Sequence, residues 1–153
     1  DPRPGHALSL APGKRVTTSM SPMMALRDGK LVYALGLPGG KRIFPSAFQA
    51  LVNLIDHGMT LQEAVEAPRV WTEGNALEIE LAFPESVRAA LTSMGHDVVQ
   101  MPTVAGGMNG IHFRDDGTQS GSACWRADGT PVALAGGLAR AGVRFGIDGK
   151  PRG

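Results

Sequence analysis

The sequence predicts an α+β fold in which an antiparallel sheet carries helices on one face. Strand-like apolar runs gather toward both ends of the chain, and helical patterns occupy the middle. Asp-Gly pairs separate several of the strand-like runs, which is typical of β-hairpins because the turn positions need positive φ angles. This order suits an antiparallel sheet with packed helices better than a parallel sheet built from repeated β-α-β units.

The first elements are expected to be a connector and a hairpin. Residues 1–15 are rich in proline and glycine and predict an extended connector. Two apolar runs at residues 22–27 and 31–35 flank the pair Asp28-Gly29 and predict two antiparallel strands. A glycine-rich loop then leads out of the second strand.

Three helices are expected in the middle of the chain. Apolar residues recur at helical spacing over residues 44–55 and would form one wide apolar stripe. Thr60 and Glu63 have the spacing of a capping box, which starts a second, shorter helix that should end before Pro68. A third helix is expected over residues 85–94, with a glycine directly after it.

The remaining elements are expected to be short strands, with Trp71 and Trp125 packed in the core. The 153 residues divide into a connector (1–15), a main unit (16–135) and a glycine-rich basic tail (136–153). The expected short strands are residues 69–71, 77–79, 97–101, 109–114, 120–126 and 131–135.

Composition limits the possible partners. The chain is 42% hydrophobic and 19% charged, as in a globular domain, and its net charge of +1 gives no basic patch for nucleic acid. No apolar run approaches the ~20 residues that span a bilayer. Cys124 is the lone cysteine and no histidines have ligand spacing, so we expect neither a metal nor a cofactor. A periplasmic and a cytoplasmic location fit equally well.

Two adjacent hydroxyls, Thr18 and Ser19, lie in the segment PGKRVTTSMSP (residues 12–22), just before the first predicted strand. Together with exposed backbone N–H groups, they are able to hold a carboxylate through several donors at once. The alternative is a hydroxyl-rich strand start whose side chains bond to the local backbone. Local sequence alone favours this second interpretation, because short motifs often match by chance.

A glycine pair, Gly39-Gly40, occupies the predicted loop between the second strand and the first helix. Two convergent backbone N–H groups are what an oxyanion hole requires, and the start of a helix adds a favourable positive end. A plain strand-to-helix turn accounts for the pair equally well. A second pair, Gly106-Gly107, precedes a predicted strand and receives no assigned role.

Three segments become informative when they are taken together. They are PGKRVTTSMSP (12–22), GLPGGKRI (36–43) and LVNLIDHGMTLQEAVEAPRV (51–70). In this order and spacing they resemble the C-terminal, small-subunit portion of the gamma-glutamyltransferase (gamma-glutamyltranspeptidase) family. The resemblance runs from about residue 12 to about residue 135, and the combination is specific although each segment alone is not.

The resemblance implies an N-terminal-nucleophile hydrolase, which is an αββα sandwich made as a proenzyme that cleaves itself. The freed Thr attacks a γ-glutamyl amide, its own α-amine acts as the base, and the acyl group passes to water or to an amine. By resemblance, Thr18 and Ser19 match the serine pair that holds the substrate's α-carboxylate. Gly39 and Gly40 match the pair that stabilises the tetrahedral oxyanion.

The chain also departs from the family pattern. Thr18 replaces the first serine of the pair, Lys41 stands where a small hydroxyl residue is common, and ACWRADG (123–129) replaces an acidic segment. These changes leave open a related amide-cleaving enzyme of the same superfamily, such as a cephalosporin-acylase-like or small-amide hydrolase. A noncatalytic scaffold domain with the same fold is an alternative from another class.

The resemblance further implies partners for this chain. The catalytic Thr and the large subunit are expected to lie upstream of Asp1, so the remainder of the proenzyme is the expected partner and a γ-glutamyl or related amide the expected substrate. The 153-residue chain alone is therefore expected to be inactive. A sandwich cut at one edge exposes apolar surface, so self-association is also expected.

Overall fold

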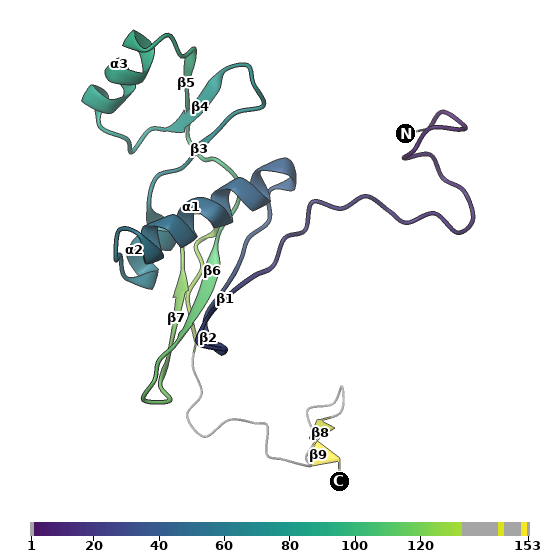
Figure 1. Cartoon of the computed structure of the whole chain (residues 1–153), viewed down its shortest axis with the longest axis vertical. Helices are drawn as coiled ribbons and strands as arrows, with labels where there is room; N and C mark the ends of the chain where they lie inside the picture. Colours follow the sequence, from purple (N-terminus) through teal and green to yellow (C-terminus); the bar gives the residue numbers. More distant parts are fainter. Residues whose placement is uncertain (1, 133–143, 146–150, 153) are drawn as a thin grey trace.

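The largest sheet among the described residues has four antiparallel strands (Figure 1). The hairpin signals in the sequence predict this antiparallel pairing. The structure is a computed structural model that describes residues 2–132, 144–145 and 151–152. The strands lie in the order β1-β2-β6-β7. Their bounds are Met23–Arg27 for β1, Lys30–Gly36 for β2, Asn109–Phe113 for β6 and Gln119–Ala123 for β7.

Left-handed turns close both hairpins of this sheet, at the predicted Asp-Gly pairs. The φ angle is 51° at Asp28, 76° at Gly29 and 82° at Gly117, conformations that glycine and aspartate adopt at low cost. In the β1-β2 register, Met23 lies opposite Leu35. The segment before β1 and the segment after β2 therefore leave the same end of the hairpin.

Helices α1 (Ile43–Ile55) and α2 (Leu61–Glu66) pack against this sheet and enclose the core. The predicted capping box starts α2: the Thr60 hydroxyl accepts from the Glu63 N–H at 3.3 Å, and the Glu63 carboxylate accepts from the Thr60 N–H at 2.7 Å. The buried residues of this core are Leu35, Ala47, Ala50, Leu54, Leu61, Ala64, Val65, Met108 and Cys124.

The opposite face of the sheet is apolar but uncovered by the described residues. Met24 and Ile111 both lie opposite Ala34 in the strand registers, so the three side chains share one face. Met24 is 69% exposed and Ile111 is 40% exposed. Leu35, the next residue of β2, points into the core instead. In an αββα sandwich, a face of this kind packs against a second sheet.

The apolar stripe predicted for the first helix is divided between two environments. Ala47, Ala50 and Leu54 are buried against the sheet, as an amphipathic helix requires. Phe44 and Phe48 are instead 58% and 55% exposed, and their rings stack on the outer side of α1 with centroids 6.2 Å apart. The helical spacing correctly predicts the helix but not which part of its wide stripe the chain covers.

A second sheet combines β3 (Val70–Trp71), β4 (Leu77–Glu80) and β5 (Val98–Met101). Strands β3 and β4 are antiparallel, whereas β4 and β5 are parallel because helix α3 (Glu85–Ser93) provides the crossover between them. This parallel pair is a difference from the purely antiparallel expectation. Figure 1 shows α3 and this smaller sheet beyond α1, on the side away from the long hairpins.

The predicted strands near the C-terminus are only partly present. The strand expected over 120–126 ends at Ala123, because Trp125–Ala127 forms a short 3-10 helix and Asp128 is left-handed. Trp125 is 48% exposed, so its expected place in the core was wrong. Residues 131–132 form no strand, and 133–135 lie outside the described residues.

The expected C-terminal tail contributes only two described pieces, β8 (Arg144–Phe145) and β9 (Pro151–Arg152), which pair antiparallel. The division of the chain at residues 15 and 135 stays a prediction. Among the residues that the structure describes, no helix is long and apolar enough to cross a membrane.

Candidate active site

The Gly39-Gly40 pair forms the junction between β2 and the first helix. Gly40–Arg42 is a 3-10 turn that continues directly into α1, and Gly39 caps it with a φ of 153° while Gly40 has a φ of 59°. Within the described part of the chain, neither glycine N–H donates a backbone hydrogen bond. Two unpaired donors at the positive end of a helix are suited to hold a negatively charged oxygen.

Thr18 and Ser19 lie at the same end of the β1-β2 hairpin but do not reach the glycines. Both are exposed, in an irregular segment that Figure 1 shows running away from the sheet. The Thr18 hydroxyl accepts a hydrogen bond from the Met20 N–H at 3.1 Å, which is the local backbone bonding of the alternative interpretation. Their proposed role in carboxylate binding therefore stays a prediction.

A shallow cleft opens beside the glycine pair. One wall is a stacked arrangement: Arg42 donates to the Glu78 carboxylate at 2.8 and 3.1 Å, and its guanidinium lies 4.0 Å from the centroid of the Trp71 ring. Lys41 pairs with Glu73 at 2.6 Å on the exposed rim. The cleft is lined by Gly39, Gly40, Lys41, Arg42, Trp71, Glu73, Asn75, Ala76 and Glu78.

Sequence reasoning missed this wall. Arg42 lies two residues after the glycine pair, which is the one local signal that could have drawn attention to it. Its partner Glu78 is 36 residues away, and no spacing rule connects them. Trp71, expected in the core, is half-buried and holds the guanidinium in place instead.

A buried charge cluster lies behind the glycine loop, centred on Glu80. The Glu80 carboxylate pairs with Arg126, and the two side chains are 1% and 0% exposed. It also accepts the Arg69 N–H at 2.9 Å and the Val104 N–H at 2.7 Å. Burial by itself would lower the pKa of Arg126, but the hydrogen bonds and charge of Glu80 outweigh it and raise that pKa. Burial, followed by the charge of Arg126, lowers the pKa of Arg69.

Cys124 adjoins the two arginines of this cluster. Its Sγ accepts the Met108 N–H at 3.1 Å and lies 3.8 Å from Nη2 of Arg69. Burial disfavours the thiolate, but the backbone hydrogen bonds and the neighbouring guanidinium groups together lower the pKa of the Cys124 thiol. The segment that departs from the family pattern thus faces this internal cluster through Cys124 and Arg126.

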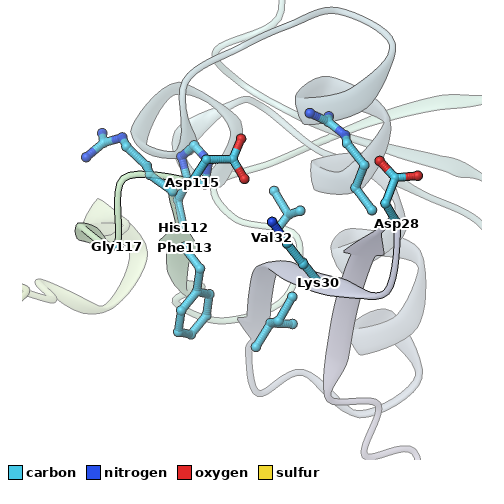
Figure 2. Close-up of a pocket in the computed structure, with 10 residues that line it drawn as sticks. Asp28, Lys30, Val32, His112, Phe113, Asp115 and Gly117 are labelled. Carbon is cyan, nitrogen blue, oxygen red and sulfur yellow. The ribbon is translucent and has the colours of Figure 1, made fainter.

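A separate open pocket, shown in Figure 2, lies at the turn end of the same sheet. It is lined in part by Asp28, Lys30, His112, Asp115 and Gly117. The glycine pair follows β2 at the opposite end of that strand. The Figure 2 pocket is therefore not part of the candidate active site. No group of three or more metal-ligating side chains occurs in the portion of the chain that the structure describes.

The gamma-glutamyltranspeptidase family profile matches residues 1–134 of this sequence. The chain belongs to that family. It is 71% identical over 147 residues to the acylase ACY 1 proenzyme of Pseudomonas sp. (strain V22), covering 96% of this chain and 26% of that protein. The chain thus spans about a quarter of the length of the curated acylase relatives that it matches.

Solved structures agree with the family assignment. The gamma-glutamyltranspeptidase of Pseudomonas nitroreducens matches with a TM-score of 0.75 and 30% identity, over 85% of this chain and 69% of that chain. The cephalosporin acylase of Bacillus halodurans matches with a TM-score of 0.79 and 29% identity, over 88% of this chain and 26% of that chain. The predicted α+β class and its place in the N-terminal-nucleophile hydrolase fold are confirmed.

The lowered pKa of Cys124 predicts a pH-dependent stability. Because the folded-state pKa lies below the unfolded value of about 8.5, the thiolate's contribution is fully present above that pH and is lost as pH falls through the folded pKa. We expect the wild-type chain to gain stability over Cys124→Ser as pH rises toward about 9. Chemical denaturation at several pH values measures this difference. A difference that stays constant across the range would contradict a buried thiolate.

Proposed function

We propose that the protein carrying this chain is an amide-cleaving acylase and that Gly39 and Gly40 supply its oxyanion-stabilising amides. The observation that carries the proposal is the pair of unpaired N–H groups beside the cleft, at the start of a helix, in a chain of this family. Thr18 and Ser19, at the same end of the β1-β2 hairpin, would hold a carboxylate of the substrate once that segment is ordered against the cleft.

The reaction divides between this chain and the remainder of the protein. An N-terminal Thr from outside residues 1–153 attacks the amide carbon, and its α-amine takes the hydroxyl proton. The carbonyl oxygen becomes negatively charged and is stabilised by the two glycine N–H groups. The C–N bond then breaks, the amine leaves with the proton, and water hydrolyses the acyl-enzyme ester. Fixed donors of this kind are each worth about 3–4 kcal/mol of barrier.

Two activities are the main candidates: an acylase whose acyl group is not γ-glutamyl, and the cleavage of γ-glutamyl amides. The 71% identity to an acylase proenzyme, against 30% to a gamma-glutamyltranspeptidase structure, supports an acylase whose acyl chain need not be γ-glutamyl. Lys41, paired with Glu73 on the cleft rim, also stands where the family commonly has a small hydroxyl residue. Cleavage of γ-glutamyl amides, with transfer to water or an amine, is the second candidate because the whole family profile carries that name.

The remainder of the protein is proposed to cover the exposed sheet face. The face that includes Met24 and Ile111 is apolar and open, and the acylase relatives are about four times as long as this chain. A second sheet from the rest of the protein would complete an αββα sandwich on this face. The chain by itself leaves the face in water, which favours self-association.

The oxyanion proposal predicts a selective loss of turnover in the whole protein. A Cβ on Gly39 would lie 2.7 Å from the Ala105 Cβ, so Gly39→Ala must displace the loop and its amides. We expect kcat to fall on the order of 100-fold with little change in KM, because the charge exists only in the transition state. Gly36→Ala is the matched control, since a Cβ there meets nothing within 4 Å. Equal kinetics for the two variants would refute the assignment.

The two substrate candidates are separated by the α-amino group. Glutaryl and γ-glutamyl anilides differ only in the α-amino group. A site that hydrogen-bonds the α-amino group discriminates against an analogue without that group by roughly 10⁴-fold or more in kcat/KM. We expect the whole protein to hydrolyse the glutaryl compound with the higher kcat/KM. A strong preference for the γ-glutamyl compound would favour the second candidate, and hydrolysis of neither would favour a noncatalytic scaffold.

The uncovered sheet face predicts association of the isolated 153-residue chain. We expect its sedimentation coefficient to rise with concentration, because burying this apolar face removes it from water. The double variant Met24→Thr and Ile111→Thr should weaken the effect. Leu10→Thr serves as the control, since Leu10 is exposed but lies outside the sheet. A strictly monomeric wild-type chain at every concentration would count against the prediction.

A further inference from the structure

The loop Val104–Gly107 is in direct backbone contact with the candidate oxyanion loop. The Gly106 N–H donates to the Pro38 carbonyl at 2.9 Å. A Cβ on Gly106 would lie 2.7 Å from Cγ of Pro38, and one on Gly39 would lie 2.7 Å from the Ala105 Cβ. The two loops are therefore joined by a backbone hydrogen bond and packed closely on each side of it, so a shift in one must be passed to the other.

The other side of the Val104–Gly107 loop is held by Arg69. Arg69 is 2% exposed. Its Nη1 donates to the Gly106 carbonyl at 2.9 Å and to the Val104 carbonyl at 3.3 Å. Its Nη2 donates to the Val65 carbonyl in α2 at 3.1 Å. One planar group thus bridges a helix of the main core and a loop of the candidate site, a geometry that a single ammonium cannot reproduce.

The loop needs such restraint because its backbone is unusual. Ala105 has a φ of 64°, in the left-handed region that non-glycine residues rarely adopt and that persists when surrounding contacts enforce it. Glu80 adds a second restraint by accepting the Val104 N–H at 2.7 Å. Gly107 packs against Ala127, since a Cβ on Gly107 would lie 2.4 Å from the Ala127 Cβ.

We propose that Arg69 is a positioning residue for the reaction, which acts through Gly106 and Pro38 to fix the amides of Gly39 and Gly40. This inference rests on the proposed oxyanion role of those amides. It also gives a role to the Gly106-Gly107 pair, as the close-packed link between Arg69 and the site. Catalytic groups must be held within roughly 0.5 Å of their productive positions, so loss of this support acts on turnover.

The test compares Arg69→Lys with Arg88→Lys in the whole protein. Arg88 is a matched control because it also donates to main-chain carbonyls, those of Leu81 and Phe83, but does not touch the Val104–Gly107 loop. We expect Arg69→Lys to lower kcat, per mole of folded enzyme, by about 10- to 100-fold with KM within about twofold of wild type. Arg88→Lys should retain wild-type kcat. Equal kcat for Arg69→Lys and Arg88→Lys, with the glycine amides unmoved, would overturn the inference.

Crystal structures of the same variants separate this inference from the proposed function. A displacement of the Gly39-Gly40 backbone by more than about 0.5 Å in Arg69→Lys supports the positioning role, and unmoved glycines overturn it whatever the kinetics. If the glycines are displaced but kcat is unchanged, the positioning role of Arg69 is supported and the oxyanion role of Gly39 and Gly40 is contradicted. If Arg69→Lys does not fold, Arg69→Gln applies the same test, because one side-chain amide replaces the guanidinium that donates to Val65, Val104 and Gly106, and Arg88→Gln is its control.

Discussion

The buried carboxylate of Glu80 is the interaction on which the arrangement of the site depends. It lies on β4 of the smaller sheet, yet it accepts hydrogen bonds from Arg69, from Val104 and from Arg126. These partners come from the segment between α2 and β3, from the loop beside the glycine pair and from the segment after β7. A buried ion pair contributes little net stability because desolvation offsets its attraction, but losing one partner leaves an uncompensated charge. We therefore infer that Glu80 acts mainly by specifying one arrangement of these segments.

This internal support separates two properties of the candidate site. We infer that the position of the Gly39-Gly40 amides is set by the backbone contact between Gly106 and Pro38 and by the buried charges behind it. The character of the cleft is set by exposed residues such as Lys41, which pairs with Glu73 on the rim. On the proposed assignment, changes at exposed cleft residues alter the acyl group that is accepted and leave the position of the two amides unchanged. The ACWRADG segment illustrates the division, because Arg126 points to Glu80 and supports the frame.

The sequence predicted correctly those structural features that a few neighbouring residues determine. The Asp-Gly turns, the Thr60-Glu63 capping box and the glycine junction before α1 are each fixed by a few adjacent residues, and the structure has all three. The Arg42-Glu78 pair and the Arg126-Glu80 pair join residues 36 and 46 positions apart, so no local pattern indicates them. Likewise, helical spacing marks Phe44 and Phe48 as apolar but does not reveal that this chain leaves them exposed.

The amides of Gly39 and Gly40 are proposed to hold the oxygen of the tetrahedral intermediate. The most direct test is a crystal structure of the whole protein carrying a covalent tetrahedral inhibitor on its nucleophile. We expect the inhibitor's oxyanion to lie about 2.7–3.1 Å from both glycine nitrogens. An oxyanion bound by other donors, with both glycine nitrogens beyond hydrogen-bond distance, would contradict it.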